Sequence, residues 1–340
     1  MLPKNPNILL IRTDRIGDVL LTLPMLPALK KRFPGSRISM MVRPYTKELV
    51  EGHSCIDEVI EYRGIDSLGS FLEFVRYLQG KEFDVAIMPY ARPMLAFALY
   101  AAGIFFRVGT GYRWYSFLFN KKLFEHRKYS VRHEVEYNLN LLKPLGITPV
   151  LPGTMELNVS AAAMETVARK LEAALVKRRF VILHPGSGGS SRDWKSENFA
   201  ALADAITARL GFEVVLTGGL GEESIVHSVA RKMSHPPASF VGELSLKELA
   251  ALIKKAACFV SNSTGPLHMA AALGTPVIAF YPPLRACSPV RWGPYTERKK
   301  IFLAESSKCP ECNGGACRSN QCMDQITVEH VFQSLREIAL

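Results

Sequence analysis

Short apolar runs alternate with amphipathic stretches along the first half of the chain. The run from Asn7 to Ile11 predicts a buried strand, and Ile38–Val42 predicts another. Between them, residues 19–33 have the apolar spacing of a helix, which Pro34-Gly35 closes. A strand, a helix and a second strand in this order indicate a βαβ unit with a parallel sheet. The pattern continues with predicted strands at 84–88 and 107–109 and a predicted helix at 94–102.

The same alternation restarts after the proline-containing stretch 149–152. It predicts strands at 180–183, 212–216, 258–261 and 276–281, and helices at 161–175, 196–210, 246–256, 265–273 and 328–338. A chain of 340 residues is long enough for two cores. We therefore predict two Rossmann-like α/β domains, at residues 1–160 and 161–325, with a C-terminal helix in 326–340 that packs back across the domains.

Composition indicates the class of protein but does not identify its partner. Apolar residues make up 48% of the chain, which predicts a globular protein, and no apolar run reaches the roughly 20 residues that a membrane span requires. The run at Ile8–Ile11 is too short for a signal peptide, so we expect a cytoplasmic protein. The formal charge of +11 suits nucleic acid, an anionic membrane surface or a phosphorylated substrate, and equally a basic surface without a partner.

Ligands of open parallel sheets bind beyond the carboxyl ends of the strands, so the loops there carry the candidate chemistry. The first loop, residues 12–18, reads Arg-Thr-Asp-Arg-Ile-Gly-Asp. Asp18 stands at the start of a helix, where the helix dipole favours an ionised carboxylate that can accept a proton. Asp18 could instead only cap the helix, and Asp14 could be the base. A Gly-x-Gly-x-x-Gly fingerprint is absent here, which disfavours an oxidoreductase.

Two later loops favour phosphate binding. The loop 184–195 is rich in Gly and Ser, so its amides and the Ser187 hydroxyl can meet phosphate oxygens, while Arg192 and Lys195 add positive charge. In the loop 261–268, a helix begins with Gly-Pro, and its first amides form an anion site. The residues that we expect around a diphosphate there are Thr264, Gly265, Leu267 and His268. No Asp-x-Asp pair occurs in the sequence, so we predict no metal and no cofactor.

Together these loops make the chain resemble glycosyltransferase family 9, the ADP-heptose:lipopolysaccharide heptosyltransferases. The resemblance extends over residues 8–24, 181–199, 261–281 and 309–323, and the Cys309-Pro-Glu-Cys312 segment is more similar to the second heptosyltransferase type than to the first. It implies a GT-B fold, in which the two domains face a central cleft, and an inverting, metal-independent transfer of heptose from ADP-L-glycero-D-manno-heptose to the lipopolysaccharide inner core.

The resemblance also implies roles for single residues. Asp18 would be the general base, and Arg192 falls near a phosphate-binding lysine of the family, a role that Lys195 could share. Glu222 and Glu223 both match the position that holds the ribose, and Leu244 matches one that packs against the adenine. Ser263 stands where many members have Asp.

Basic and aromatic residues are interleaved between Arg107 and Arg132. This pattern suits single-stranded nucleic acid, but beside donor loops it favours an anionic lipid acceptor, and an ordinary solvated loop is the plainer interpretation. The resemblance identifies that acceptor as a Kdo–lipid A core at the cytoplasmic face of the inner membrane, with peripheral contact to anionic lipid and no nucleic acid as partner. We expect the acceptor to contact Arg15, Arg113, Lys121 and Lys122.

Four cysteines lie close together near the end of the chain, at Cys309, Cys312, Cys317 and Cys322. They could bind a structural zinc through four thiolates, but the spacings after Cys312 are not those of a zinc ribbon. Free thiols or a clasp formed on oxidation are the preferred interpretation. The functions that compete with heptose transfer are a transferase or epimerase acting on another nucleotide sugar, and a basic nucleic-acid-binding protein.

Overall fold

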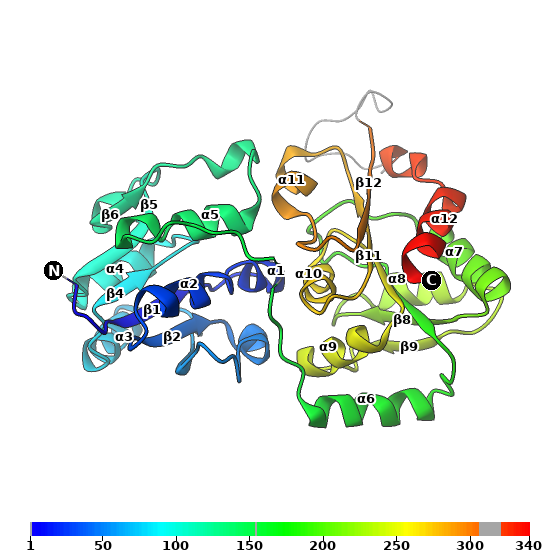
Figure 1. Ribbon diagram of the computed structural model, residues 1–340, viewed down its shortest axis with the longest axis horizontal. Coiled ribbons are helices and arrows are strands. Elements are labelled where there is room, and N and C mark those ends of the chain that lie inside the picture. Colours follow the sequence, from blue (N-terminus) through cyan, green and yellow to red (C-terminus); the bar gives the residue numbers. More distant parts are fainter. Residues whose placement is uncertain (1, 154, 306–320) are drawn as a thin grey trace. The chain divides into compact units, whose positions relative to one another are not determined.

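The computed structural model describes residues 2–153, 155–305 and 321–340. The chain divides into two compact units, Met1–Asn158 and Val159–Leu340, and each contains one six-stranded parallel sheet (Figure 1).

The sheet of the first unit has the order β3-β2-β1-β4-β5-β6. Its strands are β1 (Asn7–Ile11), β2 (Arg37–Val42), β3 (Glu58–Glu61), β4 (Val85–Ile87), β5 (Phe106–Thr110) and β6 (Lys121–Leu123). The helices are α1 (Ile16–Leu20), α2 (Met25–Arg32), α3 (Leu68–Gly80), α4 (Pro93–Ala101) and α5 (Glu134–Asn140), with 3-10 turns η1 (Pro44–Leu49), η2 (Ser116–Leu118), η3 (Arg127–Tyr129) and η4 (Lys143–Leu145). Strand β1 is central, and its residues from Ile8 to Ile11 are fully buried, as an apolar run in a parallel sheet must be.

The second unit repeats this order as β12-β11-β10-β7-β8-β9. Its strands are β7 (Phe180–His184), β8 (Glu213–Gly218), β9 (Ala238–Val241), β10 (Cys258–Asn262), β11 (Val277–Tyr281) and β12 (Lys299–Leu303). The helices are α6 (Ala161–Ala173), α7 (Ser196–Leu210), α8 (Glu223–Ala230), α9 (Leu246–Lys255), α10 (Gly265–Ala272), α11 (Pro289–Trp292) and α12 (Val328–Ala339), and the 3-10 turns are η5 (Arg285–Cys287) and η7 (Gln321–Gln325). Both sheets therefore have the strand order of a dinucleotide-binding fold, which confirms the predicted pair of Rossmann-like domains.

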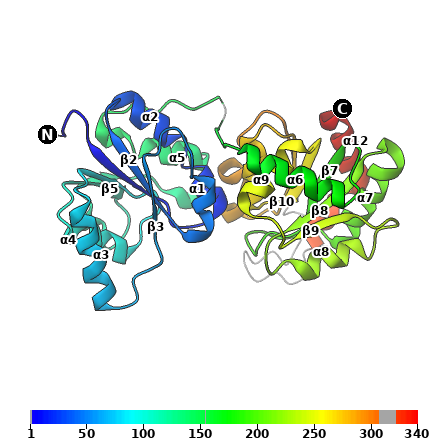
Figure 2. The same ribbon diagram turned by 90° about the horizontal axis from the view of Figure 1, so that it is seen from below.

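Helices cover both faces of the second sheet (Figure 2). Helices α6 and α9 pack together on one face, while α7 packs against α8 and α12 on the other. The core of that second face includes Trp194, Phe199 and Phe332, all at most 1% exposed. The contacts of α12 with α7 and β10 lie within the second unit, and the predicted return of this helix across the first unit stays a prediction.

The single helix predicted at 19–33 is wrong. The structure has two helices there, α1 and α2, separated by Leu21–Pro24. Pro24 has no amide hydrogen and stands at the N-cap of α2, so the hydrogen-bond ladder of α1 cannot continue through it. This break leaves α1 only five residues long, with Asp18 at its centre.

Candidate active site

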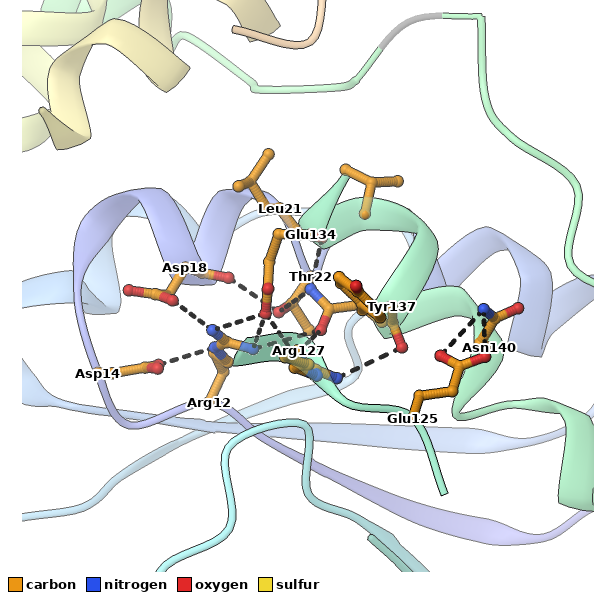
Figure 3. Close-up of polar contacts among 12 residues, drawn as sticks. Arg12, Asp14, Asp18, Leu21, Thr22, Glu125, Arg127, Glu134, Tyr137 and Asn140 are labelled. Atoms are coloured by element: carbon orange, nitrogen blue, oxygen red, sulfur yellow. Dashed lines mark hydrogen bonds and ion pairs between the residues drawn. The ribbon is translucent and has the colours of Figure 1, made fainter. Parts of the chain in front are cut away.

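The loop that follows β1 is organised by a buried arginine. Arg12 is 1% exposed, and its guanidinium makes an ion pair with Asp14 from the same loop and another with Asp18 from α1 (Figure 3). Nε of Arg12 donates to Oδ1 of Asp14 at 2.8 Å, and Nη2 donates to Oδ1 of Asp18. One planar side chain thus holds both candidate carboxylates in place.

Helix α5 supplies the remaining acceptors for this guanidinium. Nη1 of Arg12 lies 3.5 Å from Oε1 of Glu134 and donates to Oδ1 of Asn138 at 3.3 Å. Glu134 is completely buried and pairs with Arg127 as well. Three carboxylates and two guanidinium groups therefore share one partly closed cluster.

This cluster shifts the pKa of two of its members. Burial disfavours the charged form of Arg12, but the carboxylates of Asp14, Asp18 and Glu134 outweigh that effect and raise its pKa. Burial and the neighbouring Asp18 charge raise the pKa of Asp14 to about 6, although Arg12 opposes the shift. Arg12 therefore stays cationic, while Asp14 takes up a proton in mildly acidic solution.

Asp18 has the geometry of a proton acceptor. Its side chain is 16% exposed, and one of its two oxygens is bound to Arg12. The residue lies in the first turn of α1, where an ionised carboxylate is favoured, and its side chain does not cap the helix, because the N-cap is Arg15. The interpretation of Asp18 as only a helix cap is therefore wrong.

In the second unit, the candidate donor loops follow three adjacent strands. Strands β10, β7 and β8 are neighbours in the sheet, and β7 and β10 flank the point where the strand order reverses. Asn262, the last residue of β10, joins two of these loops. Its Nδ2 donates to the carbonyl of Pro185 at 2.7 Å, and its Oδ1 accepts from the backbone amide of Trp194 at 2.8 Å.

Glu222 ties the loop after β8 to the loop after β7. Its Oε1 accepts from the amide of Gly188 at 2.9 Å, and its Oε2 accepts from the amide of Gly219 at 2.7 Å. A Cβ at Gly186 would lie 2.1 Å from Oε1, so only glycine admits the carboxylate here. Two amides that could face a phosphate thus bind a protein carboxylate in this structure.

Several groups act on the pKa of Glu222. Burial would raise it, but the hydrogen bond and charge of His184 and the two amides lower it to about 2. Glu223 is placed differently, since its Oε1 accepts from the amide of Gly221, two residues earlier. The two acids left open by the sequence therefore occupy distinct environments, and only Glu222 reaches the loop after β7.

The other predicted donor residues lie in or beside these loops. Ser187 is buried, and Lys195 pairs with Asp324 at 2.7 Å at the N-cap of α7. Thr264 is the N-cap of α10, whose first residues are Gly265 and Pro266. Among the rest, Leu267 and His268 are buried, and Arg192 and Leu244 are half-buried.

The predicted acceptor residues belong to the first unit. Arg15 is exposed at the N-cap of α1, next to the Asp18 turn. Arg113 is exposed in the turn after β5. Lys121 and Lys122 lie on the edge strand β6, which β4 and β5 separate from β1, the strand that leads to Asp18.

Cys309, Cys312 and Cys317 lie outside the described residues. Cys322 is buried in the apolar core of the second unit beside Met323 and Ile326. Among residues 2–153, 155–305 and 322–340, no group of three His, Cys, Asp or Glu side chains is arranged to hold a metal. In the same part of the chain, no helix combines the length and the hydropathy of a membrane span.

The sequence interpretation missed three residues that organise these loops. Glu134 and Asn138 were assigned no role because they follow Arg12 by 122 and 126 positions. Asn262 was noted only as part of its loop. A signal for the first pair was present, since an arginine directly after a buried strand needs anionic partners from elsewhere in the fold.

Comparison with known proteins identifies the family. The model of glycosyltransferase family 9 (heptosyltransferase) matches residues 71–322. The chain is 29% identical over 331 residues to lipopolysaccharide heptosyltransferase 3 of Escherichia coli K12, covering 95% of each protein. The structure of Escherichia coli heptosyltransferase II superposes with a TM-score of 0.83 at 22% identity, covering 98% of each chain. An Escherichia coli heptosyltransferase solved with ADP gives 0.72 at 22% identity, covering 97% of this chain and 99% of that one. With these relatives and its paired Rossmann-like units, the chain belongs to glycosyltransferase family 9 and is a glycosyltransferase of the GT-B fold.

Proposed function

We propose that this enzyme is an inverting, metal-independent heptosyltransferase that moves heptose from ADP-L-glycero-D-manno-heptose to the inner core of lipopolysaccharide. Family membership supports the sugar, and the relative named lipopolysaccharide heptosyltransferase 3 supports the acceptor class. The related structure with bound ADP supports the nucleotide. The observation that carries the proposal is the Asp18 carboxylate, held by a buried guanidinium beyond the end of β1.

The reaction is a single displacement. An acceptor hydroxyl attacks the anomeric carbon of the donor, its proton passes to Asp18, and the bond from that carbon to the diphosphate oxygen breaks on the opposite side. Inversion follows because the new bond forms opposite the leaving group. Asp18 suits the role of base, since Arg12 fixes one carboxylate oxygen and the side chain reaches solvent.

The leaving group is ADP, which departs with additional negative charge. We assign its stabilisation to the first amides of α10, at Gly265 and Leu267, to the hydroxyls of Ser187 and Thr264, and to the charges of Arg192 and Lys195, with His268 as a further hydrogen-bonding side chain. We assign the ribose to Glu222, which is the acid that already reaches the loop after β7, and contact with the adenine to Leu244. The absence of an Asp-x-Asp pair and the supply of cationic side chains support a metal-independent mechanism.

We propose that the first unit binds the acceptor at the cytoplasmic surface of an anionic membrane. Every aromatic among the exposed large apolar side chains of the described residues lies in the first unit. Trp114 and Phe117, which are 73% and 64% exposed, both contact Phe97, and Arg113 stands beside them in the chain. Exposed aromatics with nearby cations suit a lipid headgroup region. Arg15, Arg113, Lys121 and Lys122 are the residues that we assign to the acceptor's anionic groups.

The test is a matched pair of isosteric variants, Asp18→Asn and Asp14→Asn, because both carboxylates lie on the same guanidinium. We expect Asp18→Asn to lower kcat for transfer from ADP-heptose by about 100-fold or more, and Asp14→Asn to retain most of the rate. The reverse result would move the role of base to Asp14. Unimpaired transfer in a folded Asp18→Ala protein would refute the mechanism.

Two further measurements separate the competing functions. An epimerase would consume the donor with no acceptor present, whereas a transferase would not. A thermal-shift series with nucleoside diphosphates should show stabilisation by ADP, since a ligand that binds only the folded state raises its melting temperature. A nucleic-acid-binding protein would instead show no such stabilisation, and would bind oligonucleotides with an affinity that collapses as salt rises.

A further inference from the structure

A second layer of charged residues binds Arg12 on the side of α5. It consists of Glu134 from α5 and Arg127 from η3, which form an ion pair (Figure 3). Asn138 accepts from both Arg127 and Arg12. Glu134 is 0% exposed, and its Oε1 is shared by the guanidinium groups of Arg12 and Arg127. A carboxylate buried away from water destabilises the fold unless cations compensate for its charge, so Glu134 requires both arginines.

We propose that Glu134 and Arg127 are positioning residues that set the orientation and the proton affinity of Asp18 through Arg12. The proposal concerns the base assigned in the proposed function and rests on that function only for its effect on catalysis. The physical link is the shared guanidinium, because any charge that binds Arg12 on the α5 side competes with Asp18 on the other side.

Asn138 makes this link rigid. Its Oδ1 accepts from Nη1 of Arg12 at 3.3 Å and from Nη1 of Arg127 at 3.1 Å, and its Nδ2 donates to the carbonyl of Leu21 at 2.9 Å. Leu21 is the C-cap of α1, the helix that carries Asp18. A displacement of the guanidinium pair is therefore transmitted to α1 through direct hydrogen bonds.

The charges around Asp18 come from every element packed on it. The loop after β1 contributes Arg12, Asp14 and Arg15. The 3-10 turn η1 contributes Tyr45, whose hydroxyl donates to the carbonyl of Asp14 at 2.6 Å, and Arg43 precedes that turn. Helix α5 and η3 contribute Glu134 and Arg127. Of these, Glu134 and Arg127 lie behind Arg12, so changing them alters the charge while leaving both direct contacts of Arg12 with Asp14 and Asp18 in place.

The two residues should therefore act in opposite directions. Glu134→Gln removes a negative charge and leaves Arg12 more fully available to Asp14 and Asp18, so the pKa of this carboxylate pair should fall by about one unit. Arg127→Met removes a positive charge and leaves Glu134 to draw on Arg12 alone, so the pKa of the pair should rise by about one unit. The double variant restores the charge balance and should return the titration close to that of the parent.

The experiment follows the aspartate side-chain carboxyl carbons by NMR as a function of pH, in the full chain labelled at that carbon. Asp14→Asn and Asp18→Asn assign the two signals. Glu58→Gln is the matched control, because Glu58 also pairs with two cations, Lys81 and Arg37, but lies on the edge strand β3. It should leave both titrations unchanged.

Opposite displacements that cancel in the double variant support the proposal, whatever the transfer activity. Curves that coincide with the parent, or displacements in the same direction for both single variants, overturn it. The acidic limb of kcat/KM against pH should move with the NMR titration. If the NMR curves move and the limb does not, Asp18 is not the base, which refutes the proposed mechanism and leaves the positioning effect established. If Glu134→Gln gives no soluble protein, the direction of the shift in Arg127→Met still tests the proposal, because the Arg127 side chain is already 22% exposed.

Discussion

The two units have the same strand order and opposite chemistry in the loop after the first strand. In the first unit, β1 is followed by a buried arginine that gathers carboxylates. In the second unit, β7 is followed by a loop rich in glycine and serine. The Glu222 carboxylate, from the loop after β8, accepts hydrogen bonds from one backbone amide of that loop and from one amide of its own turn. One scaffold therefore presents a carboxylate from a charged cluster in one unit, and amide hydrogens in the other. This division suits the proposed base in the first unit and the proposed binding of the anionic leaving group in the second.

The largest expected difference between the units concerns the residues at the ends of the two first strands. Arg12→Ala would leave three carboxylates without their common cation, so we expect the free energy of unfolding to fall by about 4 kcal/mol. The corresponding side chain in the second unit, His184, bonds Thr217 at 3.0 Å and lies 3.5 Å from Glu222. We expect His184→Ala to cost roughly 2 kcal/mol. Chemical denaturation of both variants measures the difference.

Arg12→Lys sharpens this prediction. A lysine keeps the charge, but its ammonium cannot present the planar fork that serves acceptors from the loop, α1 and α5 together. It should recover less than half of the lost stability. Equal losses in Arg12→Ala and His184→Ala would show that the first loop holds no special charged cluster.

The second prediction concerns Glu222, whose pKa is lowered to about 2 from an ordinary value of 4.5. A carboxylate with a lowered folded-state pKa stabilises the protein above pH 4.5, and this contribution disappears as the pH falls toward 2. Glu222→Gln should therefore lower the free energy of unfolding by roughly 3 kcal/mol at pH 7 and by much less near pH 2.5. Glu223→Gln, which removes the neighbouring acid, is the control and should leave the stability almost unchanged at either pH. A loss for Glu222→Gln that does not depend on pH would contradict the amide-bound carboxylate.

The sequence predicted the scaffold well because strand runs such as 8–11 and 258–260 are fully apolar, a property that depends only on local residues. It could not predict the break at Pro24 from spacing alone, because residues 19–33 keep helical periodicity across the proline. The charged cluster was out of reach for a different reason. Glu134, which also binds Arg127, meets Arg12 only once β1 and α5 are brought together in the fold, more than 100 positions apart. The choice between Glu222 and Glu223 likewise depends on which side chain faces Gly186, and adjacent positions in a sequence do not distinguish this.

The third prediction compares two glycines of the donor loop. A Cβ at Gly186 would lie 2.1 Å from Glu222 Oε1, whereas a Cβ at Gly188 would meet nothing within 4 Å. Gly186→Ala should therefore expel the carboxylate and cost about 2 kcal/mol, together with weaker ADP binding. Gly188→Ala should cost about 1 kcal/mol, because its backbone has φ near +54° and only the conformational strain of alanine applies. Urea unfolding and calorimetric titration with ADP separate the two effects, and equal costs would place the Glu222 carboxylate elsewhere.

The smallest expected effect has the opposite sign and lies in the first unit. The pKa of Asp14 is raised to about 6 from 3.8, so the folded protein binds a proton here more tightly than the unfolded chain. Its charged form therefore destabilises the fold, by an amount that grows as the pH rises from about 4 to 6 and then stays constant. Asp14→Asn should raise the free energy of unfolding above pH 6 by about 1–2 kcal/mol, less than the full pKa shift implies, because the amide is a weaker acceptor for Nε of Arg12. Below pH 4 the gain in stability should vanish.

Stability curves of Asp14→Asn and Glu222→Gln, measured over the same pH range, should thus depart from the parent in opposite directions. If both variants are destabilising at pH 7, the first loop carries no excess of negative charge, and the contrast between the two units is lost.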